Sequence, residues 1–183
     1  MFSLIIALAL SAAQDIAAAP EAEADPAAAE AAPVPKEPER DPVTGELPVD
    51  PYEMSNANAG AGSFSGTGMR DAFHGQDGIR RIVNDMVDRS VADPRISEIF
   101  VAHDLVRLRR TLFEQFCYIL NAGCDYSGRD MANSHKDLGL QVDDLNVLVE
   151  HLQAAMAAET ISFAAQNRFL SKLAPMKRDV VTR

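Results

Sequence analysis

Beyond residue 69 the sequence lacks most of what interrupts a helix or builds a sheet. Proline occurs there only as Pro94 and Pro175, and no segment alternates apolar and polar residues as a half-buried strand would. The sequence also lacks an apolar run that could span a bilayer, because its opening run from Leu4 to Leu10 falls far short of the roughly 20 residues that a spanning helix needs. These absences predict an all-α domain and no stable membrane span.

Positive charge is scarce as well, and its distribution argues against a nucleic-acid partner. Residues 15–68 hold eleven acidic side chains against Lys36 and Arg40, so this segment carries −9 of the formal net charge of −10. Residues 69–183 are close to neutral, with 16 acidic and 15 basic residues. Because binding to a nucleic-acid backbone needs an excess of clustered Lys and Arg, we expect no such partner.

The first residues resemble an export signal. Small residues follow the opening apolar run, and Ser11 and Ala13 are placed for cleavage before Gln14. We therefore predict a signal peptide over residues 1–13 and a periplasmic protein. The absence of Lys and Arg beside Met1 leaves an uncleaved apolar tail and a cytoplasmic location as the alternative.

Residues 14–68 are rich in Ala, Pro, Glu and Gly, as in "AAPEAEADPAAAEAAPVPKEPERDP" and "NANAGAGSFSGTG". Such a segment has too little large apolar surface to offset the entropy lost when it becomes ordered. The composition therefore predicts a disordered, acidic tether over residues 14–68, followed by one domain over residues 69–183.

Amphipathic helices account for the apolar residues of that domain. In "GIRRIVNDMVDRSVADP" the apolar residues recur at intervals of three and four until Pro94 ends the helix. The segment "AHDLVRLRRTLFEQFCYILNAG" repeats the pattern between Asp104, a candidate N-cap, and Gly123, a candidate stop signal. Two helices of a bundle are therefore expected before residue 124.

Two further helices follow a short polar connector. The segment "VDDLNVLVEHLQAAMAAE" carries an apolar stripe that includes Leu145 and Leu148. The last helix is expected to begin near Thr160, and Pro175 should kink it. The connector before them, "RDMANSHKDLGL", is too short and polar to be a core helix, so its His135 borders whatever the long helices enclose.

The order of several short motifs resembles that of the group I truncated haemoglobins. The motifs "HGQDGIRRIV", "ADPRISEIF", "YSGRDM", "SHKDLGL", "VEHL" and "LAPMKRDVV" follow one another with the family's intervals, without gaps from Met86 to His135. Each motif alone is weak, but together they cover about residues 69–183. The resemblance implies a truncated globin-like two-over-two helical sandwich, preceded here by the disordered tail.

The resemblance implies haem b, iron protoporphyrin IX, as the cofactor and His135 as its iron ligand. Phe100 of "EIF" corresponds to the phenylalanine that closes the distal corner of the haem pocket in this family. The position of His135 makes chemical sense, because an axial ligand needs one free imidazole nitrogen and a second nitrogen oriented by an acceptor. Gly139 lets the chain turn away behind it.

The chain departs from the family where a bound ligand would be stabilised. Group I members usually place a tyrosine and a glutamine toward the sixth coordination position, and this chain has Val87 and Leu112 there. Leu108 is apolar too, so dioxygen would lose a hydrogen-bond donor worth about 1–3 kcal/mol and should leave faster. Gln115 lies on the same face, either near a ligand or, as we favour, bonded to a neighbouring backbone group.

Further pocket residues are expected around these positions. Arg107 is a candidate partner for a haem propionate, beside Arg109 and Arg110 in the same turn. The complete set of predicted cofactor-binding residues is Phe100, Val87, Leu108, Leu112, Phe116, Arg107, Met131, Leu145 and Leu148, with His135 as the metal ligand.

The remaining histidines and the two cysteines are given structural roles. His151 is expected to pack within its helix, and His74 and His103 are expected at the surface. The "CxxCH" motif of covalently attached haem is absent. Cys117 and Cys124 are seven residues apart, too far to bond within a continuous helix, so free thiols are favoured; a helix end at Gly123 and export would favour a disulfide.

Three functions remain open at this stage. We favour reversible binding of a diatomic gas (oxygen, nitric oxide or carbon monoxide), with an unidentified reductase as a candidate partner. The first alternative is an enzyme that oxidises nitric oxide with dioxygen or acts as a peroxidase; the hydrocarbon side chains of Val87, Leu108 and Leu112 count against it. The second alternative is a haem-free helical interaction module.

Overall fold

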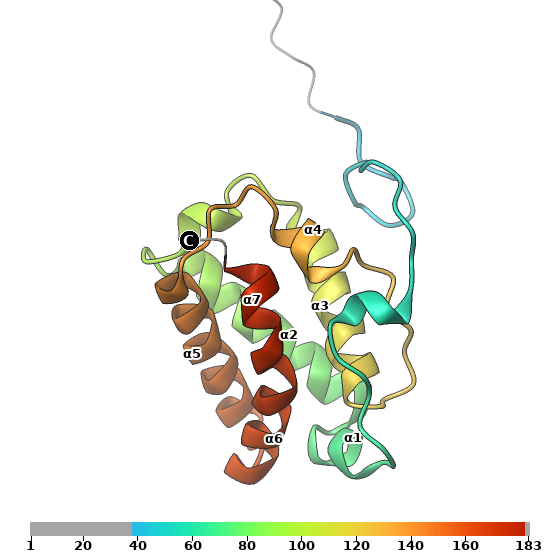
Figure 1. Ribbon diagram of the computed structural model, residues 1–183, viewed down its shortest axis with the longest axis vertical. Helices are drawn as coiled ribbons and strands as arrows, with labels where there is room; N and C mark the ends of the chain where they lie inside the picture. Colours follow the sequence, from blue (N-terminus) through green and yellow to red (C-terminus); the bar gives the residue numbers. More distant parts are fainter. Residues whose placement is uncertain (1–37, 182–183) are drawn as a thin grey trace, which may run out of the picture. The chain divides into compact units, whose positions relative to one another are not determined.

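The computed structural model describes residues 38–181, and these contain helices and turns but no strand. The expectation of an all-α domain is therefore confirmed. Figure 1 shows how the α-helices are arranged. Three short 3-10 turns also occur in the described residues. The α-helices are α1 (Gly68–Ala72), α2 (Gly75–Ala92), α3 (Leu105–Ile119), α4 (Met131–His135), α5 (Val142–Ala158), α6 (Phe163–Leu173) and α7 (Lys177–Val180); the turns are η1 (Asn56–Ala59), η2 (Ser97–Phe100) and η3 (Ala174–Met176).

The long helices pack in pairs around one core. Helix α2 lies against both α3 and α5, and α7 lies against α4 (Figure 1). Phe169 of α6 is fully buried, and its ring meets the rings of Phe73 and Phe116 edge to face, at centroid distances of 5.2 and 4.9 Å. These aromatic contacts join α6 to α3 and to the C-terminal end of α1.

The helix ends follow the signals in the sequence. Asp104 is the N-cap of α3, where its side chain accepts a hydrogen bond from the Val106 N–H. Ser162 caps α6 in the same way, so the last long helix begins close to the predicted position. Pro175 interrupts the C-terminal helix as expected, because η3 separates α6 from α7 at this residue.

The predicted disordered tether, residues 14–68, extends too far toward the C-terminus, because residues 38–68 are ordered in the structure. Residues 38–64 run along the helical domain, and we call residues 40–60 the strap. The Leu47 N–H donates to Asp104, the Tyr52 hydroxyl donates to the Ser127 carbonyl, and Ala59 is fully buried. The prediction failed because the strap is ordered by many polar contacts with α3 and the loop before α4, which a composition dominated by small and acidic residues does not reveal.

Residues 1–37, with the predicted signal peptide, lie outside the described residues.

The expectation of free thiols is wrong, because Cys117 and Cys124 form a disulfide. Helix α3 ends at Ile119, and Asn121 and Gly123 then adopt left-handed conformations, with φ of 57° and 85°. This reversal brings the two Cα atoms to 5.6 Å, inside the range that a disulfide requires. The alternative of a helix end between the cysteines is the correct one.

Within residues 38–181, no helix combines the length and the apolar character needed to cross a membrane.

Candidate functional site

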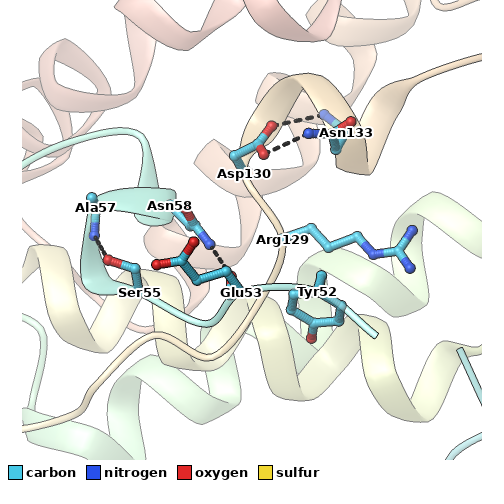
Figure 2. Close-up of a pocket in the computed structure, with 8 residues that line it drawn as sticks. All are labelled: Tyr52, Glu53, Ser55, Ala57, Asn58, Arg129, Asp130 and Asn133. Atoms are coloured by element: carbon cyan, nitrogen blue, oxygen red, sulfur yellow. Dashed lines mark hydrogen bonds between the residues drawn. The ribbon is translucent and has the colours of Figure 1, made fainter. Parts of the chain in front are cut away.

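Two of the cavities formed by residues 38–181 are similar in size, and their walls differ. The first, of about 540 Å³, lies between the strap and the start of α4, as Figure 2 shows. Its walls are mostly polar, and Asp130 there is already engaged as the N-cap that accepts from the backbone and side chain of Asn133. The residues that line it are Tyr52, Glu53, Ser55, Ala57, Asn58, Arg129, Asp130 and Asn133. Such walls do not suit a large apolar ligand.

The second cavity, of about 490 Å³, is lined mainly by hydrocarbon side chains from α2, α3, α5 and the C-terminal helices. Its volume lies within the range of about 300–1,000 Å³ that is typical of cofactor and small-molecule sites. The structure brings His135 and all but one of the predicted cofactor-binding residues to this cavity. The predicted residues that line it are Val87, Phe100, Leu108, Leu112, Phe116, Met131, Leu145, Leu148 and His135.

His135 is held at the cavity by the one-and-a-half turns of α4. Asp130 caps this helix, and Gly139 with φ of 64° turns the chain away behind it. The Nδ1 atom of His135 lies 2.7 Å from the Met131 carbonyl oxygen. A carbonyl oxygen can only accept, so Nδ1 carries the proton and Nε2 keeps a free lone pair.

The electrostatic surroundings of His135 favour the same neutral form. Burial lowers the pKa of His135 below its ordinary value of 6.5, and the nearby His103 lowers it further, against the opposing effect of the hydrogen bond to Met131. A neutral imidazole with Nδ1–H bonded to a carbonyl is the form in which histidine binds a metal through Nε2.

The expected role of Arg107 at the cavity is wrong. Its side chain does not line the cavity but turns to the strap, where it donates to the Leu47 carbonyl and pairs with Glu46 at 3.1 Å. Arg110 pairs with the same Glu46 carboxylate, and Arg109 pairs with Asp88. No local sequence signal indicates these contacts, because Glu46 lies in the segment that the composition predicts to be disordered.

Two basic residues that the sequence did not single out for the site lie at the cavity instead. His103 is exposed, as expected of a surface residue, but it also lines the cavity just before α3 begins. Lys177, the first residue of α7, lines it too and is exposed. The sequence contains one indication of Lys177. This residue directly follows Met176, an apolar residue of the last amphipathic segment that is buried in the structure.

His151 and His74 take no part in the cavity. His151 is buried between α2 and α5, where Nδ1 lies 3.0 Å from the Ser90 hydroxyl and Nε2 lies 3.1 Å from the Asp93 carboxylate. His74 is exposed before α2, within 3.8 Å of Glu159. Both positions agree with the structural roles expected from the sequence.

Gln115 lines the cavity but does not offer its N–H groups to it. Its Nε2 donates to the Ala59 carbonyl at 2.9 Å and contacts the sulfur atoms of Met131 and Met176 at 3.4 and 3.7 Å. The favoured interpretation, a glutamine bonded to a neighbouring backbone group, is confirmed. The partner comes from the strap, 56 residues earlier in the chain.

The second cavity fits a flat, largely apolar cofactor with charged groups at one edge. Its long walls carry half-buried leucines that such a ring would cover, among them Leu112, Leu145 and Leu148. One neutral imidazole with a free nitrogen lines the cavity, and two exposed basic side chains are available for acidic substituents. This set of residues suits an iron porphyrin.

A comparison with family models places residues 69–182 in the bacterial-like globin family. Among curated relatives, the Group 1 truncated hemoglobin GlbN of Nostoc commune is 26% identical over 113 residues, which cover 62% of this chain and 96% of that protein. The Group 1 truncated hemoglobin LI410 of Chlamydomonas moewusii is 29% identical over 85 residues, covering 45% of this chain and 50% of that protein.

Solved structures show the same fold. The ferric truncated hemoglobin of Tetrahymena pyriformis superposes with a TM-score of 0.60 at 18% identity, covering 63% of this chain and 98% of that one. A 2/2 hemoglobin from Synechococcus, solved with covalently attached heme, gives a TM-score of 0.59 at 19% identity, covering 63% and 98%. The predicted two-over-two helical sandwich is thereby confirmed.

Proposed function

The chain belongs to the bacterial-like globin family as a group I truncated, haem-binding globin, and we propose that it holds haem b through His135 and reversibly binds a diatomic gas. The observation that carries the proposal is the state of His135. This neutral imidazole lines an apolar cavity and has its Nδ1 proton fixed on the Met131 carbonyl. When bound, haem would supply an iron atom that takes one nitrogen ligand from the protein and an exchangeable gas ligand.

Different residues of this chain would bind the iron, the ring and the acidic substituents of that cofactor. Nε2 of His135 would bind the iron, and the hydrogen bond from Nδ1 to Met131 orients the ring and makes it a better ligand. Leucines of α3 and α5 would exclude water from the bound cofactor, and Phe100 would cover part of it. His103 and Lys177 replace Arg107 as the partners of the propionates, because the Arg107 guanidinium is engaged by the strap.

The gas side of the cavity favours reversible binding over oxidation chemistry. Val87, Leu108 and Leu112 offer only hydrocarbon surface. A ligand with partial negative charge therefore lacks a stabilising contact of about 1–3 kcal/mol and should leave rapidly. This property argues for a carrier, sensor or scavenger of gas rather than for an enzyme that oxidises nitric oxide.

Export to the periplasm is part of the proposal. The disulfide between Cys117 and Cys124 supports it, because stable disulfides form in oxidising compartments and are rare in the cytoplasm of most bacteria. If residues 1–13 are a cleaved signal, N-terminal sequencing of the protein from a periplasmic fraction will begin at Gln14. A cytoplasmic protein with Met1 intact would contradict this part of the proposal.

Absorption spectroscopy of the purified full chain tests the proposed function. After titration with hemin, we expect a one-to-one complex with a sharp Soret band, which shifts on reduction and again on addition of carbon monoxide. Removal of carbon monoxide should restore the ferrous spectrum. A colourless protein that takes up no hemin would support the haem-free interaction module instead.

A further inference from the structure

Helix α4 is too short to hold His135 in place by itself. It contains five residues, and helices shorter than about 12–15 residues are marginally stable in water without packing partners. It nevertheless supplies Met131, Ser134 and His135 to the wall of the second cavity. Helix α7 lies against α4, and the loop before α4, residues 125–129, leads into its N-cap, Asp130. What fixes this loop therefore also fixes His135.

The strap bonds to every residue of this loop. Asn56 makes two of the bonds, because its Nδ2 donates to the Asp125 carboxylate at 2.9 Å and its Oδ1 accepts from the Tyr126 N–H at 2.7 Å. A donor and an acceptor are thus each matched, which fixes the orientation of the Asn56 amide. The other bonds join the Tyr52 hydroxyl to the Ser127 carbonyl at 2.9 Å, Nδ2 of Asn58 to the Gly128 carbonyl at 3.2 Å, and the Arg129 guanidinium to the Asp50 carbonyl at 2.8 Å.

The end of the strap also reaches α4 itself, at Met131. Gly60 approaches this residue so closely that a Cβ atom on the glycine would stand 3.0 Å from Cγ of Met131. Gln115 links the same two segments, because its Nε2 donates to the Ala59 carbonyl and lies 3.4 Å from the Met131 sulfur. The carbonyl of Met131 is the acceptor that holds Nδ1 of His135. Contacts therefore run without a break from the strap to the imidazole.

From these contacts we infer that the strap positions the iron ligand. Through Asn56 and Asn58 it fixes the loop before α4, and so keeps the His135 imidazole at the second cavity with Nε2 free. The two asparagines do not line that cavity, so they act through His135 as positioning residues. The inference rests on the proposed function, because it concerns the ligand of a bound haem. It goes further by giving a role to residues that precede the matched globin region, 69–182.

An exchange of two side chains tests the contact that Asn56 makes. Asn56→Asp sets a carboxylate against that of Asp125 and keeps only the acceptor for the Tyr126 N–H, so the loop should loosen. The addition of Asp125→Asn to this variant returns a donor to the pair and with it both bonds. Arg40→Gln is the matched control, because it breaks the contact of the strap with Asp104 at the start of α3 and leaves the bonds to the loop in place.

Nuclear magnetic resonance of the haem-free full chain reads the state of His135 without the cofactor. Long-range ¹H–¹⁵N spectra at mildly alkaline pH, with the His135 signals assigned by their absence in His135→Ala, should show a proton on Nδ1 alone in the wild type and in Arg40→Gln. In Asn56→Asp we expect both tautomers, because the ring is no longer fixed on the Met131 carbonyl. The exchanged pair should restore the single form. A single form that persists in Asn56→Asp, or no recovery in the exchanged pair, would overturn the inference.

The rate of haem transfer from the loaded ferric protein to excess apomyoglobin measures the same effect on the bound cofactor. We expect Asn56→Asp to lose haem about tenfold faster than the wild type, because removal of a group that orients a metal ligand typically weakens binding by at least this factor. The exchanged pair should lose haem at the wild-type rate. Equal rates in Asn56→Asp and Arg40→Gln would overturn the inference and leave the proposed function intact. A chain that takes up no hemin, but whose His135 tautomers follow the variants as expected, would contradict only the proposed function.

Discussion

The carboxylate of Glu46 forms a two-pronged ion pair with the guanidinium of Arg110, 64 residues further along the chain. Glu46 is only 5% exposed, and the guanidinium of Arg107 lies against the same carboxylate. Arg110 also donates to Glu114 and to Ser127, so this pair ties the strap to α3 and to the loop that leads to α4. The acidic segment before the globin domain is therefore a structural part of that domain from this residue onward.

Replacement of Glu46 by glutamine should destabilise the protein. The change leaves the half-buried Arg107 without its carboxylate partner and Arg110 with only that of Glu114, and a lost hydrogen bond to a charged group costs about 1.5–3 kcal/mol. Urea denaturation should report a loss of this size. The exposed Glu39→Gln is the matched control and should change stability little. Equal effects of the two substitutions would show that the strap contributes nothing to folding.

Reduction of the disulfide should also lower stability. The bond between Cys117 and Cys124 closes a loop of eight residues, for which loop-closure entropy predicts a contribution of about 2–3 kcal/mol. Mass spectrometry of the unreduced protein should show a mass two hydrogens lower than that of the dithiol. Urea denaturation with and without reductant then measures the contribution; a double variant with serine at both positions should match the reduced protein and be insensitive to reductant.

The pairing of Asp93 should make stability fall at acid pH. Hydrogen bonds from Arg95, followed by the bond from His151, hold the pKa of Asp93 well below its ordinary value of 3.8. A carboxyl with a lowered pKa in the folded state stabilises the fold above its unfolded pKa, and this stabilisation is lost as the pH falls from about 4 toward the folded value.

Unfolding curves measured from pH 7 to pH 3 test this dependence. Asp93→Asn should be less stable than the wild type at neutral pH, and the difference should shrink below about pH 4, where the carboxyl of the unfolded wild-type chain begins to bind a proton while that of the folded chain stays ionised. Glu98→Gln, an exposed residue of η2, serves as the control. A difference that stays constant over this range would argue against the ion pair as the cause.

The helices could be predicted from the sequence because their signals are local. The periodic apolar residues, the cap at Asp104 and the break at Pro175 all act within one or two turns, and each has its expected effect. The apolar wall could be predicted because residues such as Leu108 and Leu112 share one helical face.

The strap and its consequences could not be predicted, because they depend on contacts between residues far apart in the sequence. Glu46 looks like one more charge in an acidic tail until Arg107 and Arg110 are placed opposite it. The carbonyl of Ala59 has no signature in the sequence, yet it accepts the hydrogen bond from the Gln115 amide. The disulfide was missed because helix spacing was extended past Ile119, where the chain reverses.

The most direct test of the account is the vibration of the bond between iron and histidine in the ferrous, haem-loaded protein. Resonance Raman spectra of protein made with ¹⁵N-histidine should show one iron–nitrogen stretching band that shifts with the isotope. We expect this band to be absent in His135→Ala and unchanged in the matched variant His103→Ala, which removes the other histidine of the cavity. Persistence of the band in His135→Ala, or its loss in His103→Ala alone, would contradict the assignment of His135 as the iron ligand.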